Sequence, residues 1–351
     1  MVFAHLIDHR PGRSLVLAHR DELIRQAVDK LLLVNPDFDI GVVKAAENET
    51  GSNVVVASVQ TLARANRLRQ IFANFNTVVV DEAHHGTADT YRRILEHVGS
   101  FSDDGPLTVG FTATPERGDK SGLGQVWDRI VYQKGILEMI LSGYLCDLKA
   151  VRVSLKVDLD RLHTRHGDYV DTELESALLD ASAPKHVVAA YQQHASGRKT
   201  LVFTPTVKVV HEMADAFRKV GIAGEALDGT TPADERRDIL KRFHSSETIV
   251  LANCAVLTEG FDEPSIDCII SARPTQSRPF YLQMIGRGTR VYPGKADCLI
   301  PGAVGDTERH RLVTADTLFD MDLSVSKRSV RQQVERDEEV HVGDDTYYSE
   351  R

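Results

Sequence analysis

The feature that most constrains the fold of this chain is an alternation, repeated in both halves, of short apolar runs with longer amphipathic stretches. The runs are rich in β-branched residues and have the length of single strands, whereas the stretches between them have the length of helices. This order is typical of βα units that build a parallel sheet. The expected strands are residues 14–17, 53–57, 77–80 and 107–111 in the first half and 200–203, 248–252, 268–271 and 297–300 in the second.

A chain of 351 residues has room for two such domains in tandem. We therefore predict an α/β fold with a first parallel-sheet domain over residues 1–150 and a second over residues 184–323. Residues 151–183 mix apolar and charged side chains without a βα period, so we expect them to connect the domains. From residue 324 the chain is polar and acidic, and residues 324–351 are expected to form a mobile tail.

Composition excludes several classes of protein. No apolar run approaches the roughly 20 residues that span a bilayer, so we expect no membrane role. The cysteines never form a CxxC pair, which argues against a zinc site or a disulfide framework and fits a reducing cytoplasm. These residues are Cys146, Cys254, Cys268 and Cys298.

The formal net charge of −9 argues against a protein that coats nucleic acid through bulk charge. Local basic patches still offer a grip on phosphates. Arg64, Arg67 and Arg69 form one candidate patch, and a solvated helix face explains the same trio equally well.

The strongest chemical signal is a pair of adjacent carboxylates, Asp81 and Glu82, directly after the apolar run Val78-Val79-Val80. Open α/β sheets place their sites at the carboxyl ends of strands. There, one carboxylate can hold Mg²⁺ through its water shell, and the next can orient or deprotonate a water in line with a γ-phosphate. Taken alone, the pair also fits an ordinary turn at a strand end.

Two later segments favour the chemical interpretation. Thr112 and Thr114 follow another apolar run, where hydroxyls can relay the state of a nucleotide. Arg287 and Arg290 are three residues apart, so a helix would place both on one face. Two guanidiniums that face a neighbouring domain suit an arginine finger, which neutralises the charge that builds on a transferred phosphoryl group.

Together, these segments resemble the motifs of superfamily 2 helicases with a DEAH box, in the same order over residues 12–310. LVLAHRDELIRQ (15–26) resembles motif Ia, ASVQTL (57–62) motif Ib, DEAH (81–84) motif II and TAT (112–114) motif III. LVFTPT (201–206) resembles motif IV, LTEGFD (257–262) motif V and QMIGRGTR (283–290) motif VI. The motif sequences most resemble those of bacterial RadD-like DNA repair helicases, and next those of XPB-type helicases and the motor subunits of type I and type III restriction enzymes.

The resemblance implies two RecA-like domains that couple hydrolysis of ATP with Mg²⁺ to movement on DNA, in particular double-stranded DNA. It assigns Asp81 to Mg²⁺, Glu82 to the attacking water and Asp262 to the neighbourhood of the ribose. The implied nucleotide-binding set is Asp81, Glu82, His84, Gly260, Asp262, Gln283, Arg287 and Arg290. The implied coupling residues are His84, Thr112 and Thr114, and the implied nucleic-acid contacts are Arg20, Thr61, Arg64, Thr204 and Thr258.

One expected element is missing from the sequence. A phosphate-binding loop reads GxxxxGK[ST] and holds phosphates at a helix N-terminus, and no such string is present. Gly197-Arg198-Lys199-Thr200 and Gly294-Lys295-Ala296 are poor matches. Residues 1–8 resemble the helix that follows this loop in the family, so we expect a truncated chain that lacks the loop, the first strand and the adenine-reading motif. A chain that works without the loop is the alternative.

Other interpretations stay open at this stage. A two-lobed clamp that binds nucleic acid or protein without turning over ATP would explain the missing loop but not the paired carboxylates and arginines. A metallohydrolase built on Asp81, His84 and His85 lacks the HExxH spacing. Trp127 and Tyr132 could stack on a base, although packing explains them more simply.

Overall fold

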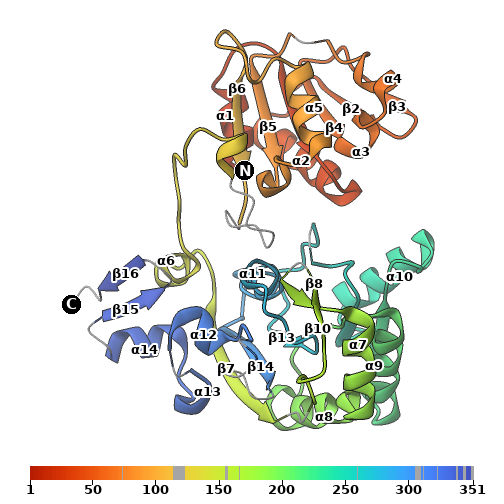
Figure 1. Cartoon of the computed structure of the whole chain (residues 1–351), viewed down its shortest axis with the longest axis vertical. Helices are drawn as coiled ribbons and strands as arrows, with labels where there is room; N and C mark the ends of the chain where they lie inside the picture. Colours follow the sequence, from red (N-terminus) through yellow and green to blue (C-terminus); the bar gives the residue numbers. More distant parts are fainter. Residues whose placement is uncertain are drawn as a thin grey trace. The chain divides into compact units, whose positions relative to one another are not determined.

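The computed structural model describes residues 1–72, 74–113, 123–154, 157–165, 167–258, 260–304, 310, 312–321, 323–336, 339–342 and 345–348. The chain divides into two compact units, Met1–Val131 and Tyr132–Arg351, which are coloured red to yellow and yellow to blue in Figure 1. Each unit is built around its own sheet.

The first unit contains a six-stranded sheet in the order β3-β2-β4-β1-β5-β6. Five of its strands are parallel, and the short β3 pairs antiparallel with β2. The parallel strands are β1 (Ser14–Ala18), β2 (Ile40–Lys44), β4 (Val54–Ser58), β5 (Thr77–Asp81) and β6 (Leu107–Phe111), and β3 is Glu47–Asn48.

Alternating side chains of the first sheet enter two separate cores, as expected for buried parallel strands. Val16, Val56 and Val79 pack with α1 (Val2–Asp8) and α2 (Asp21–Val34) on one face. Leu17, Val55 and Val80 pack on the other face. The helices that cover this second face are α3 (Val59–Leu62), α4 (Ala65–Leu68) and α5 (Asp89–His97).

The second unit contains a six-stranded, wholly parallel sheet in the order β11-β12-β10-β13-β14-β7. Its strands are β7 (Asp147–Ser154), β10 (Thr200–Phe203), β11 (Gly224–Leu227), β12 (Val250–Asn253), β13 (Cys268–Ser271) and β14 (Asp297–Val304). Two small antiparallel pairs lie outside it. These are β8 (Thr164–Arg165) with β9 (Asp168–Tyr169), and β15 (Glu339–Val342) with β16 (Asp345–Tyr348).

Helices cover both faces of the second sheet. One core joins it to α8 (Ala183–Ala190), the π-helical turn Tyr191–Ala195 and α9 (Val207–Lys219). The opposite core joins it to α6 (Ile136–Leu141), α10 (Ala233–His244), α11 (Arg278–Gly286), α12 (Ala315–Phe319) and α14 (Val330–Arg336). The segment from 171 to 180 forms α7 (Asp171–Asp180), and α13 is Leu323–Ser326.

The predicted α/β fold with two parallel-sheet domains is confirmed, and all eight predicted strands are present. Four strands of the two sheets were not predicted: β3, which has only two residues, and three others that were missed for local reasons. β2 is only half-buried at alternate positions, and β11 (GEAL) lacks β-branched residues. β7 carries Asp147, Lys149 and Arg152 among its apolar residues, so it does not read as a buried strand.

The division between the units differs from the expected boundary at residue 150. β7 pairs with β14 along its whole length, and Leu137, Ile140 and Leu148 are buried in the core of the second unit. Residues 132–150 therefore belong to that unit. The expected connector also packs there, because Leu159, Tyr169 and Leu174 share a small core with Leu312. We call residues 157–165 and 167–180 the connector segment.

The expected mobile tail also differs from the structure in its first part. Val330 and Val334 of α14 are buried in the second unit. The backbone N–H of Arg331 donates to Asp147 Oδ1 at 3.2 Å, and its guanidinium donates to the carbonyl of Ile140. These two valines are the only apolar residues of α14, and charged and polar residues surround them. The amphipathic pattern is therefore too short to predict a helix from the sequence. Within the described residues, no helix has the length and apolar character to cross a membrane.

Candidate functional site

The carboxyl end of β5 carries the two predicted carboxylates. Asp81 ends the strand, and Glu82 adopts the left-handed conformation with φ 50° and ψ 54°. A residue with a side chain rarely adopts this backbone, and it turns the chain sharply into the short helical turn Ala83–His85. β5 and β6 pair with Asp81 opposite Phe111, so the residue after Phe111 lies beside the turn.

This register brings His84 to Thr112. His84 Nδ1 lies 3.0 Å from Thr112 Oγ1 and 3.4 Å from Glu82 Oε2. Glu82 Oε2 is buried and has no hydrogen-bond partner among the described residues. His84 thus contacts both Glu82 and Thr112, whereas Thr114 lies outside the described residues.

The Asp81 carboxyl is in an environment that disfavours its charge. Burial raises its pKa above the ordinary value, and the negative charge of Glu82 raises it further. The backbone N–H of Glu82, which donates to Asp81 Oδ1 at 3.1 Å, and the charges of His19 and Lys30 act in the opposite direction. A cation bound here would favour the ionised carboxylate.

Two adjacent carboxylates are a donor set that Mg²⁺ accepts. In the part of the chain that the structure describes, no group of three His, Cys, Asp or Glu side chains forms a complete metal site. Mg²⁺ commonly takes only one or two carboxylates and completes its shell with water and substrate phosphates. The buried Glu82 Oε2, which has no hydrogen-bond partner among the described residues, is consistent with a site that a ligand completes.

The rings of His19, His84 and His85 lie against one another beside this edge. His85 is 4.1 Å from His84 and 5.0 Å from His19 between ring centroids. His85 is half-buried. Trp127 packs against the backbone of this turn, because its Nε1 donates to the carbonyl of Ala83 at 3.1 Å. Packing therefore accounts for Trp127.

The nucleic-acid contacts predicted in the first unit differ in accessibility. Arg20 is the residue before α2 at the carboxyl end of β1 and is half-buried. Thr61 is buried, and its hydroxyl accepts from the backbone N–H of Ala45 at 3.0 Å. Arg64 is exposed at the start of α4. Of these three, only Arg64 presents its side chain openly to solvent.

In the second unit, the predicted arginines follow the end of α11. Arg287 donates from Nε to the carbonyl of Thr258 at 3.0 Å and from Nη1 to the carbonyl of Phe261 at 2.9 Å. Arg290 Nη1 donates to the same Phe261 carbonyl at 3.1 Å, and its Nε lies 3.2 Å from Asp262 Oδ1. Both guanidiniums are therefore held by the loop that resembles motif V.

The other predicted residues of this unit take varied positions. Gly260 has φ +75°, a conformation that favours glycine, within the loop that holds the arginines. Gln283 is half-buried on α11. Thr204 and Thr258 are buried at 3% and 5% exposure. Thr204 Oγ1 donates to the carbonyl of Asn253 at 3.2 Å, so its side chain bonds to its own fold.

A residue that sequence reasoning passed over is Lys295. In the sequence, Lys295 stands out only as part of a poor match to a phosphate-binding loop. Its ammonium donates to the carbonyls of Gly288, Arg290 and Pro264 at 2.6, 2.8 and 3.1 Å, and burial lowers its pKa. Lys295 therefore ties the turn of Arg287 and Arg290 to the chain that follows the motif V loop. The sequence held no signal for this role, since it depends on burial.

Family models match both units of the chain. Residues 1–117 match the model described as the Res subunit of type III restriction enzymes. Residues 182–292 match the helicase conserved C-terminal domain. The first match spans the whole first sheet, and the second spans the second sheet except β7 and β14. The matches include the segments that resemble motifs Ia to III and IV to VI.

Curated proteins with helicase names are similar over most of the chain. "Putative ATP-dependent helicase IRC3" of Saccharomyces cerevisiae is 38% identical over 314 residues, which are 88% of this chain and 45% of that protein. "DNA 3'-5' translocase XPB2" of Sulfurisphaera tokodaii is 24% identical, over 72% of this chain and 63% of that protein. The chain spans about half the length of the first of these relatives.

Solved structures show the same fold at low sequence identity. "The fragment structure of a putative HsdR subunit of a type I restriction enzyme from Vibrio vulnificus YJ016" matches with a TM-score of 0.65 and 21% identity, over 90% of this chain and 56% of that one. Saccharomyces cerevisiae Dbp5 bound to RNA and ADP BeF3 matches with a TM-score of 0.60 and 15% identity, over 88% of this chain and 77% of that one.

Proposed function

Because the chain belongs to the superfamily 2 helicases, we propose that it is the motor core of an ATP-dependent DNA helicase or double-stranded DNA translocase. The observation that carries the proposal is the arrangement at the end of β5. Glu82 has a buried oxygen without a hydrogen-bond partner among the described residues, next to Asp81, whose charge is disfavoured, and 3.4 Å from His84, which contacts Thr112. A site of this kind is suited to a magnesium-bound nucleotide.

In this proposal Asp81 holds Mg²⁺ through its water shell and Glu82 orients the attacking water and accepts its proton. When bound, Mg²⁺ supplies neutralisation of charge on the phosphates. His84 and Thr112 form a direct link between the turn after β5 and the end of β6. A movement of the turn after β5 would therefore be transmitted to the end of β6.

Arg287 and Arg290 take the role of arginine fingers, with Gln283 and Asp262 beside the same nucleotide. Their support is the loop from Thr258 to Asp262, which holds both guanidiniums through its carbonyls and one carboxylate. A finger must be preorganised to stabilise charge that appears only in the transition state. ATP would then hold the two units together, and hydrolysis would release them.

The proposed partner is DNA, gripped mainly through its backbone with little preference for sequence. Arg64 and Arg20 are the candidate phosphate contacts of the first unit. Support comes from the resemblance to DNA repair helicases and from the similarity to a protein named as a DNA translocase. The hydroxyls of Thr61, Thr204 and Thr258 are less suited to this role than expected, since all three side chains are buried.

The test is ATP hydrolysis by the protein in the longest form that its reading frame encodes, with double-stranded DNA, single-stranded DNA or RNA added. We expect hydrolysis that double-stranded DNA stimulates and that Glu82→Gln abolishes. Glu96→Gln on the exposed surface of α5 is the matched control and should leave turnover unchanged. DNA binding without turnover would instead favour a clamp, and stimulation by RNA alone would overturn the choice of DNA.

A further inference from the structure

The connector segment is fastened to the loop that precedes α11. This loop, residues 272–277, runs from the end of β13 to the first residue of the helix. Asp168 accepts from the backbone N–H of Gln276 at 3.1 Å and from the hydroxyl of Thr275 at 2.7 Å. Thr275 and Gln276 are more than a hundred residues away in sequence, so this contact is purely tertiary.

The contact continues into the first turn of α11. Thr275 Oγ1 accepts from the backbone N–H of Ser277 at 3.0 Å. Ser277 is the N-cap of α11, and its hydroxyl accepts from the N–H of Phe280 at 3.3 Å. A chain of hydrogen bonds thus runs from the Asp168 carboxylate through Thr275 to the N-cap. N-caps fix where a helix begins and how it enters the fold.

A largely buried arginine strengthens the same junction. Arg273 has 17% side-chain exposure and lies 3.0 Å from Asp171 and 3.6 Å from Asp168. Its guanidinium also lies over the ring of Phe280 on α11, at 4.4 Å from the ring centroid. The planar guanidinium can donate to both carboxylates from its edge while its face lies against the aromatic ring. Arg273 therefore ties the connector segment to α11 as well as to β13.

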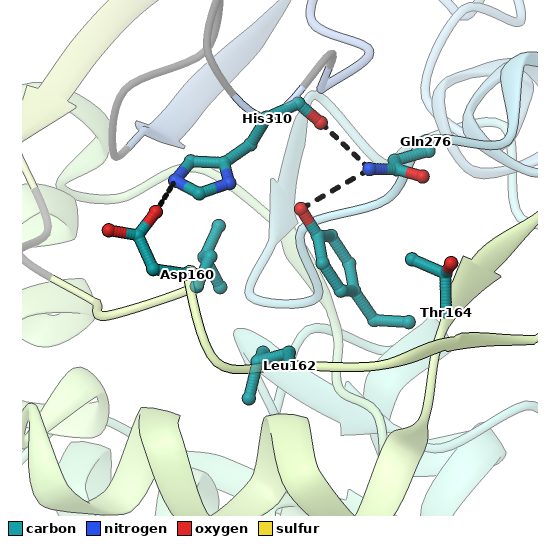
Figure 2. A pocket seen from close by; sticks show the side chains of 7 residues that line it. Asp160, Leu162, Thr164, Gln276 and His310 are labelled. Carbon is teal, nitrogen blue, oxygen red and sulfur yellow. Dashed lines mark hydrogen bonds and ion pairs between the residues drawn. The ribbon is translucent and has the colours of Figure 1, made fainter.

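The loop 272–277 also contacts the connector segment at a pocket of about 350 Å³ (Figure 2). Its lining includes Asp160 and Tyr169 of the connector segment and Gln276 of the loop. Gln276 Nε2 donates to Tyr169 Oη at 3.4 Å and to the carbonyl of His310 at 2.9 Å, and His310 Nε2 lies 3.3 Å from Asp160 Oδ1. Figure 2 shows Asp160 turned toward the His310 ring and Gln276 turned toward the His310 carbonyl.

We infer that Asp168, Asp171 and Arg273 are positioning residues for the arginines proposed as fingers. α11 carries Gln283 and ends one residue before Arg287, so a shift or fraying of its first turn is passed along a rigid helix of nine residues. The connector segment thereby determines the orientation of Arg287 and Arg290 without contacting the nucleotide. This inference rests on the proposed function, since it concerns how those arginines act.

The primary test compares Asp168→Asn/Asp171→Asn with the control Asp158→Asn/Glu173→Gln in the longest encoded form of the protein. Both pairs remove two carboxylates from the same segment, and the described contacts of Asp158 and Glu173 are within that segment. We expect kcat for ATP to fall about ten- to a hundredfold in the first pair, with KM for ATP and the Kd for DNA nearly unchanged. An unchanged kcat, or an equal loss in the control, would overturn the inference.

A third variant separates positioning from simple loss of stability. Asp168→Asn/Asp171→Asn leaves Arg273 as an unpaired buried charge, and adding Arg273→Met removes that charge. We expect the triple variant to regain thermal stability but not kcat, because the tie to α11 remains absent. Recovery of both would mean that only the unpaired charge mattered, and the inference would fail.

Hydrogen exchange gives a readout that does not need turnover. The backbone N–H groups of Phe280 and Tyr281 depend on the Ser277 cap. They should exchange about tenfold faster in Asp168→Asn/Asp171→Asn than in the control pair. Equal exchange in the two pairs would count against the inference. Absence of hydrolysis in the wild-type protein would instead contradict the proposed function, so the two failures are distinguishable.

Discussion

The carboxyl end of the first sheet and the turn that carries Arg287 and Arg290 in the second unit are organised in opposite ways. At the first, Glu82 has a buried oxygen without a hydrogen-bond partner among the described residues, and the local environment disfavours the charge of Asp81. At the second, Arg287 and Arg290 are bonded to the loop from Thr258 to Asp262 and supported by Lys295. The first is thus incomplete without a ligand, whereas the second is already assembled. The proposed metal site can be incomplete in the free protein because a bound cation supplies the positive charge that the carboxylates need. The proposed arginine fingers, in contrast, must be preorganised.

The largest expected effect is at the incomplete edge. Glu82→Gln keeps the size and left-handed backbone of the residue but removes its capacity to accept a proton. We expect ATP hydrolysis to fall about a thousandfold while ATP binding remains. Steady-state hydrolysis and equilibrium binding of a fluorescent ATP analogue, measured on the same samples, check this result. Equal losses of binding and turnover would mean that Glu82 shapes the site rather than acting in the reaction.

The assembled turn should respond to a change in packing alone. A Cβ added at Gly288 would lie 2.4 Å from Cys298 Sγ and 2.6 Å from Ile269 Cγ1, whereas one added at Gly286 meets nothing within 4 Å. We expect Gly288→Ala to destabilise the second unit by ~1–3 kcal/mol. Thermal unfolding of Gly288→Ala and Gly286→Ala measures the difference. Similar midpoints for the two variants would show that this turn is looser than its contacts indicate.

A smaller effect is expected at the link between the two strand ends of the first unit. Thr112→Val preserves shape and removes the hydroxyl that contacts His84 Nδ1. Loss of one such hydrogen bond costs about 1 kcal/mol. We expect stimulation of hydrolysis by DNA to fall roughly fivefold with basal hydrolysis retained. Thr108→Val on β6, which contacts Ser100 instead, is the control. Loss of basal hydrolysis as well would place Thr112 in the nucleotide site itself.

The smallest effect is a change in how stability depends on pH. The folded-state pKa of Asp81 is raised, so the folded protein holds its proton to higher pH than the unfolded chain does. The unfavourable contribution of this group is therefore absent at low pH, grows as pH rises from the unfolded pKa to the folded one, and is complete above it. Asp81→Asn should stabilise the first unit at neutral pH and flatten that slope.

Chemical denaturation at several pH values measures the Asp81 contribution. Mg²⁺ alone should stabilise the wild-type protein more than Asp81→Asn, because the cation favours the ionised carboxylate. A variant that is less stable than the wild type throughout the pH range would show that Asp81 is not held at a cost. The two regions would then be alike in being already satisfied.

Much of this architecture was determined by the sequence itself. The apolar runs at residues 14–17, 77–80 and 268–271 are local signals, and each became a buried parallel strand. The position of Asp81 and Glu82 at a strand end followed from the same run. Arg287 and Arg290 are also close together, as their spacing indicated, although they lie just after the helix rather than within it. Periodicity and spacing are properties of neighbouring residues, so they can be read without a fold.

The rest depended on partners that are distant in the sequence. The resemblance implied that Thr204 and Thr258 contact nucleic acid, but the tertiary fold buries both. β7 reads as a charged segment, and only its pairing with β14 makes it a strand of the second sheet. The sequence of the connector segment does not indicate that Asp168 contacts Thr275, because the residue type of a carboxylate does not identify its hydrogen-bond partner. Sequence fixes which residues can form elements, whereas long-range packing decides which polar groups are buried, paired or left for a ligand.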